Sequence, residues 1–263
     1  MDLLSAVGLV TKRRGDYLSQ AETLAKKAKT QEQLEQKMFE ESKVLVKGLR
    51  DKQMRWEEYE RSLMDKTLVS ALAAVYLGAE DANPREKMAK AWSAIVGDMM
   101  PPLLAFLDET KDYIDQGLLR IGDQTQDFAD VDWNKYFDDD FEMDDEVLTD
   151  PDDPSKYEIQ NPAKHAASVA STPGGVGRTW KGVLSRVVRY LGTPTFGFFN
   201  LGQFMVKQEQ GFKEMRRIAR KDKRTCVDCK GYDAQGWQPI GTLPMPGHGC
   251  RCYDRCRCSI EYR

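Results

Sequence analysis

The first 225 residues of this 263-residue chain contain no cysteine, and the whole chain has only two histidines. Histidine and cysteine carry much of the proton-transfer and nucleophilic chemistry of enzymes. The carboxylates are numerous, but they stand in runs rather than in isolated pairs. An enzyme needs a convergent set of such groups in a pocket, so we expect no catalytic residues and no small-molecule substrate.

Long hydrophobic runs are also missing. Residues 67–79 and 190–206 are among the longest uncharged stretches. The first is too short to span a bilayer, and glycines and a proline interrupt the second. At the N-terminus the basic residues follow the apolar run and no cleavage site is recognisable, which is the reverse of a secretory signal. We therefore expect no membrane span and no export.

Proline is absent before Pro84, and residues 1–122 read as a helical bundle. Apolar residues recur there at spacings of three, four or seven, which places them on one face of a helix. They are Leu34, Met38, Leu45, Leu49, Trp56, Tyr59 and Leu63. The same periodicity runs from Pro84 to the pair Pro101–Pro102 and resumes beyond it. The pattern predicts three or four antiparallel helices, with no more than a trace of strand between residues 15 and 121.

The charge distribution is uneven, although the net charge is only −3. Residues 123–153 hold fourteen acidic side chains against one lysine, whereas residues 178–224 hold twelve basic against three acidic. We interpret residues 123–178 as an acidic and Gly/Pro-containing linker. Its acidic part is either a solvated connection or an acidic, aromatic strip that docks on a basic surface. The opposite charges suggest two partners or contacts between copies.

Residues 179–224 form a third region, for which we predict basic helices around an aromatic segment. Trp180 to Leu191 has an apolar face typical of an amphipathic helix. Residues 192–205 are rich in glycine and phenylalanine and have low helix preference, so we expect them to need a partner surface. Residues 208–223 are basic and are predicted to be helical again.

All six cysteines lie in residues 225–263. A C-x2-C pair followed, after a loop rich in glycine and proline, by a second group of cysteines is typical of a structural zinc site. We predict Cys226, Cys229, Cys252 and Cys256 as ligands, because the spacing lets each pair face one ion. Alternative ligands are Cys258, Cys250 and His248. Disulfides remain the competing interpretation, which requires an oxidising compartment.

A module of this size cannot bury enough apolar surface to fold unaided, so bound metal would supply folding free energy. We expect a β-hairpin after Cys229 and a terminal strand at Ser259 to Tyr262. The predicted fold is thus mainly α, an N-terminal helical bundle with a small zinc-ribbon-like β-hairpin module.

The last 45 to 80 residues resemble the C-terminal module of phage minor head proteins, the head-morphogenesis family typified by the F protein of phage Mu. The resemblance rests on a basic segment that leads into D-x-x-T-C-x2-C, then glycines and prolines, then C-x3-C-R-C. The residues are Asp222, Thr225, Cys226, Cys229, Gly236, Gly241, Pro244, Pro246, Cys252, Cys256, Arg257 and Cys258. His248 and Cys250 form a second, overlapping H-x-C-R-C, so the ligand register stays open.

The resemblance implies a non-enzymatic structural protein of the virion head or neck, present in the host cytoplasm during assembly. Its partners would be portal or capsid proteins and other copies of itself, with a contact to packaged DNA in addition. The alternative is a cytoplasmic zinc-ribbon protein that binds nucleic acid, because many arginines and lysines flank the cysteines. The sequence pI of about 5.6 argues against this alternative.

Overall fold

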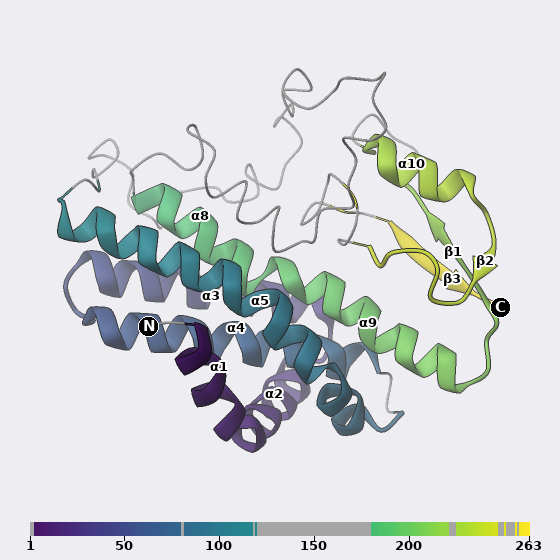
Figure 1. The fold of residues 1–263 in the computed structure, drawn as a ribbon, viewed down its shortest axis with the longest axis horizontal. Helices are drawn as coiled ribbons and strands as arrows, with labels where there is room; N and C mark the ends of the chain where they lie inside the picture. Colours follow the sequence, from purple (N-terminus) through teal and green to yellow (C-terminus); the bar gives the residue numbers. More distant parts are fainter. Residues whose placement is uncertain are drawn as a thin grey trace.

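The computed structural model describes residues 3–79, 82–117, 119, 180–220, 225–246, 250, 256 and 258–263. Its helices are α1 (Leu3–Lys12), α2 (Arg14–Ala28), α3 (Gln31–Arg50), α4 (Trp56–Gly78), α5 (Pro84–Asp115), α8 (Trp180–Leu191), α9 (Thr193–Glu209) and α10 (Val227–Ala234). Its strands are β1 (Glu214–Ile218), β2 (Gln238–Pro239) and β3 (Ser259–Tyr262). The predicted fold class is confirmed, because a helical bundle carries a small antiparallel sheet near the C-terminus (Figure 1).

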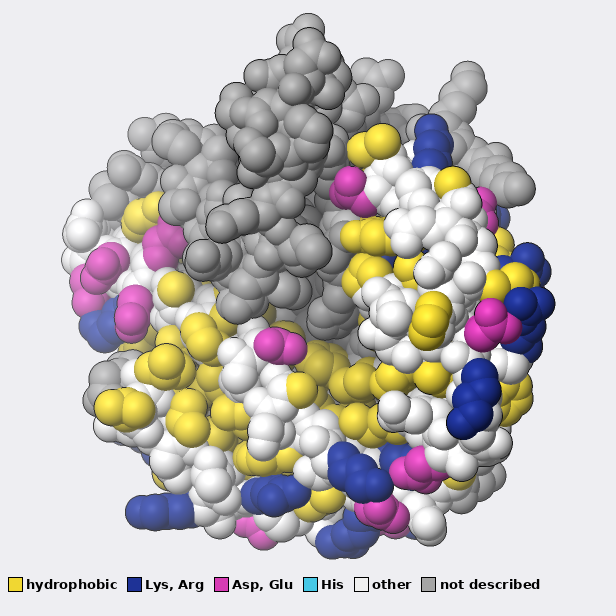
Figure 2. Space-filling model, turned by 45° about the vertical axis from the view of Figure 1, so that its right-hand side comes forward, with side chains coloured by type: hydrophobic (Ala, Val, Ile, Leu, Met, Phe, Trp, Pro, Cys, Tyr) yellow, Lys and Arg dark blue, Asp and Glu magenta, His cyan; other side chains and the backbone are white. Residues whose placement is uncertain are grey.

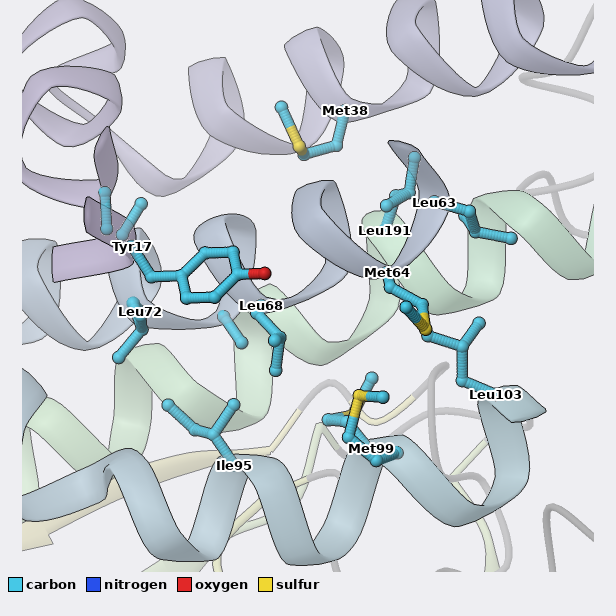
Figure 3. Packing of buried hydrophobic residues seen from close by; sticks show 14 of the residues in the cluster. Tyr17, Met38, Leu63, Met64, Leu68, Leu72, Ile95, Met99, Leu103 and Leu191 are labelled. Carbon is cyan, nitrogen blue, oxygen red and sulfur yellow. The ribbon is translucent and has the colours of Figure 1, made fainter. Parts of the chain in front are cut away.

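The core of the bundle lies where the apolar faces of α2, α3, α4, α5 and α8 meet (Figure 3). The predicted stripe is buried, with Leu34 and Leu63 fully inaccessible and Trp56 packed against the same cluster. Tyr17 lies in this core, and its hydroxyl donates a hydrogen bond of 2.5 Å to Asp65 of α4. Arg13 reaches the same carboxylate at 3.1 Å, so a polar contact joins the start of α2 to α4.

Pro101 and Pro102 do not end a helix, contrary to the break that we expected there. Helix α5 runs through both of them. Each proline removes one backbone donor and ordinarily kinks or ends a helix. Here burial outweighs that cost, because residues on both sides of the pair reach the core. Those that are buried include Met99, Met100, Leu103 and Leu104.

Helix α8 has the predicted bounds, and its predicted apolar face packs into the bundle core. The buried residues of this face are Val183, Leu184, Val187, Val188 and Leu191. On its other side, Arg186 forms an ion pair with Glu109 of α5, and Tyr190 donates a hydrogen bond of 2.8 Å to the carbonyl of Pro102. Helix α8 therefore shares one core with the N-terminal helices.

The segment of residues 192–205 is helical, and this corrects our prediction of low helix content. It forms most of α9, which crosses α4 (Figure 1). Phe198 is 3% exposed inside the bundle core, and Phe199 packs against that core. Phe196 instead packs against the cysteine cluster of the C-terminal module. The surface that these aromatic residues need is thus supplied by the same chain.

The predicted basic helix over residues 208–223 is also wrong. Helix α9 ends at Glu209, and Gly211 follows with a φ of +85°, a backbone conformation that glycine adopts without strain. The chain then enters β1, the central strand of a sheet with the order β2-β1-β3. Met215 pairs with Gln238 of β2 and with Tyr262 of β3, both antiparallel. Of the strands that we expected, the terminal one at Ser259–Tyr262 is confirmed, whereas Cys229 is followed by the rest of α10 and by the two-residue strand β2.

The helices of the described part of the chain include none that is both long and apolar enough to cross a membrane. The predicted linker of residues 123–178, with its acidic strip, lies outside the described residues.

Candidate metal centre

Strand β1 lies beside the candidate site and contributes inward-pointing side chains to it. Side chains alternate along a strand. Here Met215 and Arg217 are buried and point into the module, while Glu214, Arg216 and Ile218 are partly exposed. The backbone of Arg263 exchanges hydrogen bonds of 3.0 Å with that of Glu214, which anchors the C-terminal end of the chain beside β1. The module is therefore built from segments about forty to fifty residues apart in the sequence.

Helix α10 presents the first two cysteines. Cys226 is the N-cap residue, and its sulfur accepts a hydrogen bond of 3.4 Å from the backbone N–H of Cys229. Cys229 lies in the first turn, and its side chain is 1% exposed. The partial positive charge at a helix N-terminus favours thiolate over thiol. The C-x2-C spacing thus places two sulfur atoms at the same electropositive end of a helix.

Three cysteines from three parts of the module converge. The sulfur atoms of Cys229, Cys250 and Cys256 lie within 4.8 Å of one another, and all three residues are buried. The sulfur atoms of Cys229 and Cys256 are 3.9 Å apart. A tetrahedral ion with metal–sulfur bonds of about 2.3 Å sets its ligand sulfur atoms about 3.8 Å apart. This buried, all-sulfur cluster could hold a metal ion.

Cys258 belongs to the same buried group, with a side chain 3% exposed. Its thiol interacts with Cys229 and Cys256 and with Arg217. The hydrogen bond with Cys229 lowers its pKa, but the hydrogen bond with Cys256, burial and the charge of Cys256 together raise the pKa above its ordinary value. Negative charge on one sulfur is therefore costly beside the next unless a cation neutralises it.

Arg217 places a cation against these sulfur atoms. Its side chain is fully buried, and its Nη2 lies 3.0 Å from the sulfur of Cys250, 3.0 Å from that of Cys256 and 3.4 Å from that of Cys229. Its Nη1 donates to the carbonyl of Pro244 at 3.2 Å, and its guanidinium stacks over the ring of Tyr232. Burial by itself lowers the pKa of Arg217. The interactions with the cysteines, first those with Cys250 and Cys256, together raise that pKa by more, so the net shift is upward.

The structure places the predicted ligands as follows. Cys229 and Cys256 lie in the cluster, and Cys226 lies beside it as the cap of α10. Cys250 and Cys258, which we gave only as alternatives, are buried members of the group. Cys252 and His248 lie outside the described residues. The prediction did not include Arg217, because its neighbours Arg216 and Arg220 made it look like part of a solvated basic surface.

The chain matches no protein-family model, no curated protein and no solved structure. The resemblance to phage minor head proteins therefore rests on the motif residues of the C-terminal module. What the geometry adds is that cysteines from both ends of that motif meet in one buried cluster.

Proposed function

We propose that this chain is a non-enzymatic structural protein of a phage particle, a minor head protein that acts in capsid and portal assembly. The observation that carries the proposal is the convergence of the motif cysteines, Cys229 and Cys256 with Cys250, on one buried cluster. Cysteines that are far apart in the sequence but meet in one cluster can bind a single ion and so hold a small module together. A helical body that holds such a module agrees with an assembly role.

We propose further that the ion held by the cluster is zinc. Soft thiolate ligands select zinc, copper(I) or iron–sulfur clusters over hard cations. Structural zinc sites are buried, four-coordinate and closed to water. Cys229, Cys250 and Cys256 would supply three ligands. We assign the fourth to Cys258, a buried sulfur that interacts with Cys229 and Cys256 but lies outside the group of three within 4.8 Å. The zinc would join α10 to the cysteines that precede β3.

The C-terminal module packs against the bundle through α9, so a metal that orders the module would also affect how the module is held on the bundle. Phe196 of α9 packs on the cysteine cluster, while Phe198, two residues later, packs in the bundle core. A Cβ at Gly241, in the loop after β2, would touch the ring of Phe204 of α9. Helix α9 thus carries the module on the bundle, and a metal that orders the module would fix the surface it presents to a portal or capsid partner.

The nucleic-acid alternative receives less support from the described arginines. Arg216 and Arg263 both lie over the ring of Trp237, at 4.9 and 4.4 Å from its centroid. They also pair with Glu261 and Glu214, respectively. Arg217 is buried. On the face drawn in Figure 2, the described Lys and Arg side chains lie mostly along the lower and right-hand edges, with Asp and Glu side chains among them. Phosphate binding requires a basic patch to be exposed and unbalanced.

The test compares assembled particles with naked DNA. Particles purified on a density gradient from a culture that produces the protein should contain the chain, detected by mass spectrometry. A chain with both Cys229→Ser and Cys256→Ser should keep its helical circular dichroism and be lost from particles, whereas Arg216→Gln should be incorporated normally. Normal particles that lack the protein, together with a tight complex between the chain and free duplex DNA, would contradict the proposal.

A further inference from the structure

Arg217 is one of the largest fully buried side chains of the described residues, and it ends in the cysteine cluster. It comes from the central strand of the sheet, whereas the sulfur atoms come from α10 and from the segments around Cys250 and Cys256. One nitrogen atom, Nη2, reaches three of these sulfur atoms at 3.0 to 3.4 Å. No other strand position offers the same contact among the described residues, because Met215 alone shares the inner face of β1.

A formal charge count explains why a cation belongs there. Four thiolates, with Cys258 as the fourth, carry a charge of −4 and a divalent metal ion carries +2, so the complex has a net charge of −2. The guanidinium offsets one of these two negative charges. An uncompensated charge inside a protein costs several kcal/mol, and arginine is suited to neutralise it because its planar fork stays protonated when buried.

The second terminal nitrogen atom of the Arg217 guanidinium, Nη1, holds the side chain in place. Nη1 donates to the carbonyl oxygen atoms of Pro244 and Met245, at 3.2 and 3.4 Å. The same guanidinium therefore joins the cysteines, the proline-containing loop and β1. Side chains that hydrogen-bond to metal ligands orient those ligands, and their loss typically lowers metal affinity by about 10- to 100-fold.

We propose that Arg217 is the positioning residue of the metal centre, which donates N–H hydrogen bonds to the metal-binding sulfur atoms and offsets part of the negative charge of the buried complex. This inference rests on the proposed metal site. Lysine cannot replace arginine here, because an ammonium group cannot span three sulfur atoms and two carbonyls. Glutamine keeps N–H donors without the charge, and methionine keeps neither.

The experiment loads the full chain with cobalt(II), whose sulfur-to-metal absorption band reports the thiolate ligands directly. The variants are Arg217→Lys, Arg217→Gln and Arg217→Met. The matched control is Arg216→Met, the neighbouring position on β1, whose side chain faces outward to Glu261 and Trp237. Affinity is measured by competition with a chelator, and the band position is measured at saturating cobalt.

We expect Arg217→Met to bind cobalt about 10- to 100-fold more weakly than the wild type. Its absorption band should move to longer wavelength, because a sulfur atom that loses an N–H donor holds its electrons less tightly. The metal-bound thiolates should also react faster with iodoacetamide. Arg217→Lys and Arg217→Gln should lie between the wild type and Arg217→Met, and Arg216→Met should match the wild type.

A purely structural role for Arg217 would lower the melting temperature and leave the band of the saturated protein where it was. Affinity and band position equal to those of Arg216→Met would overturn the inference and leave the metal site standing. A wild-type chain that takes up no cobalt would overturn both. Should Arg217→Met not fold, Arg217→Lys and Arg217→Gln decide the question against the same control.

Discussion

Gly202 of α9 lies directly against the backbone of Gly78 in α4. A Cβ atom at Gly202 would overlap the carbonyl oxygen of Val75, and a Cβ atom at Gly78 would overlap the carbonyl oxygen of Phe199. The two helices therefore cross with their backbones in contact, which only glycine at both positions permits. This crossing sets the position of α9, and through Phe196 it sets the position of the cysteine module.

Substituting either glycine of this crossing should destabilise the protein. Gly202→Ala should lower the free energy of unfolding by about 1–3 kcal/mol or more, because the methyl group meets backbone atoms that cannot rotate away. Gly97→Ala is the matched control, since Gly97 lies in helix α5 with open space around its Cβ position. That control should stabilise the protein by about 0.5–1 kcal/mol. Urea denaturation measures both, and a neutral Gly202→Ala would refute the close crossing.

Single cysteine variants should show which of the cysteines bind the zinc ion. Protein prepared without chelator should contain close to one zinc ion per chain, and Cys229→Ser or Cys256→Ser should lose it. Cys226→Ser should keep its zinc, because the Cys226 sulfur caps α10 and serine caps a helix equally well. Elemental analysis gives the metal-to-protein ratio. Wild-type protein without zinc and with six titratable or oxidised thiols would contradict the site.

The two faces of α9 should be separable by mutation. Phe198→Ala should lower the free energy of unfolding by about 3–5 kcal/mol, because Phe198 lies in the bundle core. Phe196→Ala should affect the module instead, because that ring packs on the cysteine cluster. Hydrogen exchange should show faster opening of β1 and α10 in Phe196→Ala, with α3 and α4 unchanged. Equal loss of protection in both regions would show that the module and the bundle unfold as one unit.

Glu209, at the C-terminal end of α9, should make stability depend on pH. Hydrogen bonds from Lys87 and Lys90 of α5 lower its pKa from the ordinary value of 4.5. A lowered carboxylate pKa adds stability that is present above pH 4.5 and is lost as the pH falls through the folded-state pKa. The melting temperature of Glu209→Gln should therefore lie below that of the wild type at pH 7.

That difference should shrink as the medium becomes more acidic than pH 4.5. In a Lys87→Met background the Glu209→Gln substitution should have a smaller effect at neutral pH, because one partner of the ion pair is already gone. A difference between wild type and Glu209→Gln that stays constant from pH 7 to pH 3 would show that the ion pair does not form.

The local pattern of apolar residues was sufficient to predict the helices that bury one face. The spacing of Leu34, Met38 and Leu45, and the face of α8 around Leu184 and Val187, predicted both the helices and their buried sides. This succeeds because helix hydrogen bonds join residues four apart and the apolar period is visible in a short window. The presence of all six cysteines within one short segment likewise predicted a cluster that could hold a metal ion, and Cys229 and Cys256 belong to that cluster.

The remaining features depend on residues far apart in the sequence. Glu214–Ile218 is a strand because it pairs with Gln238–Pro239 and Ser259–Tyr262, and its two adjacent arginines hide the alternation that would mark a strand. The helix over residues 192–205 packs closely on α4 at Gly202 and Gly78, a contact between positions far apart in the sequence. The sequence alone therefore determined where amphipathic helices and a cysteine module would form. Only the tertiary structure decided that Arg217, one of several neighbouring basic residues, is buried among three sulfur atoms, because its burial requires the sheet, α10 and both cysteine segments to be assembled at once.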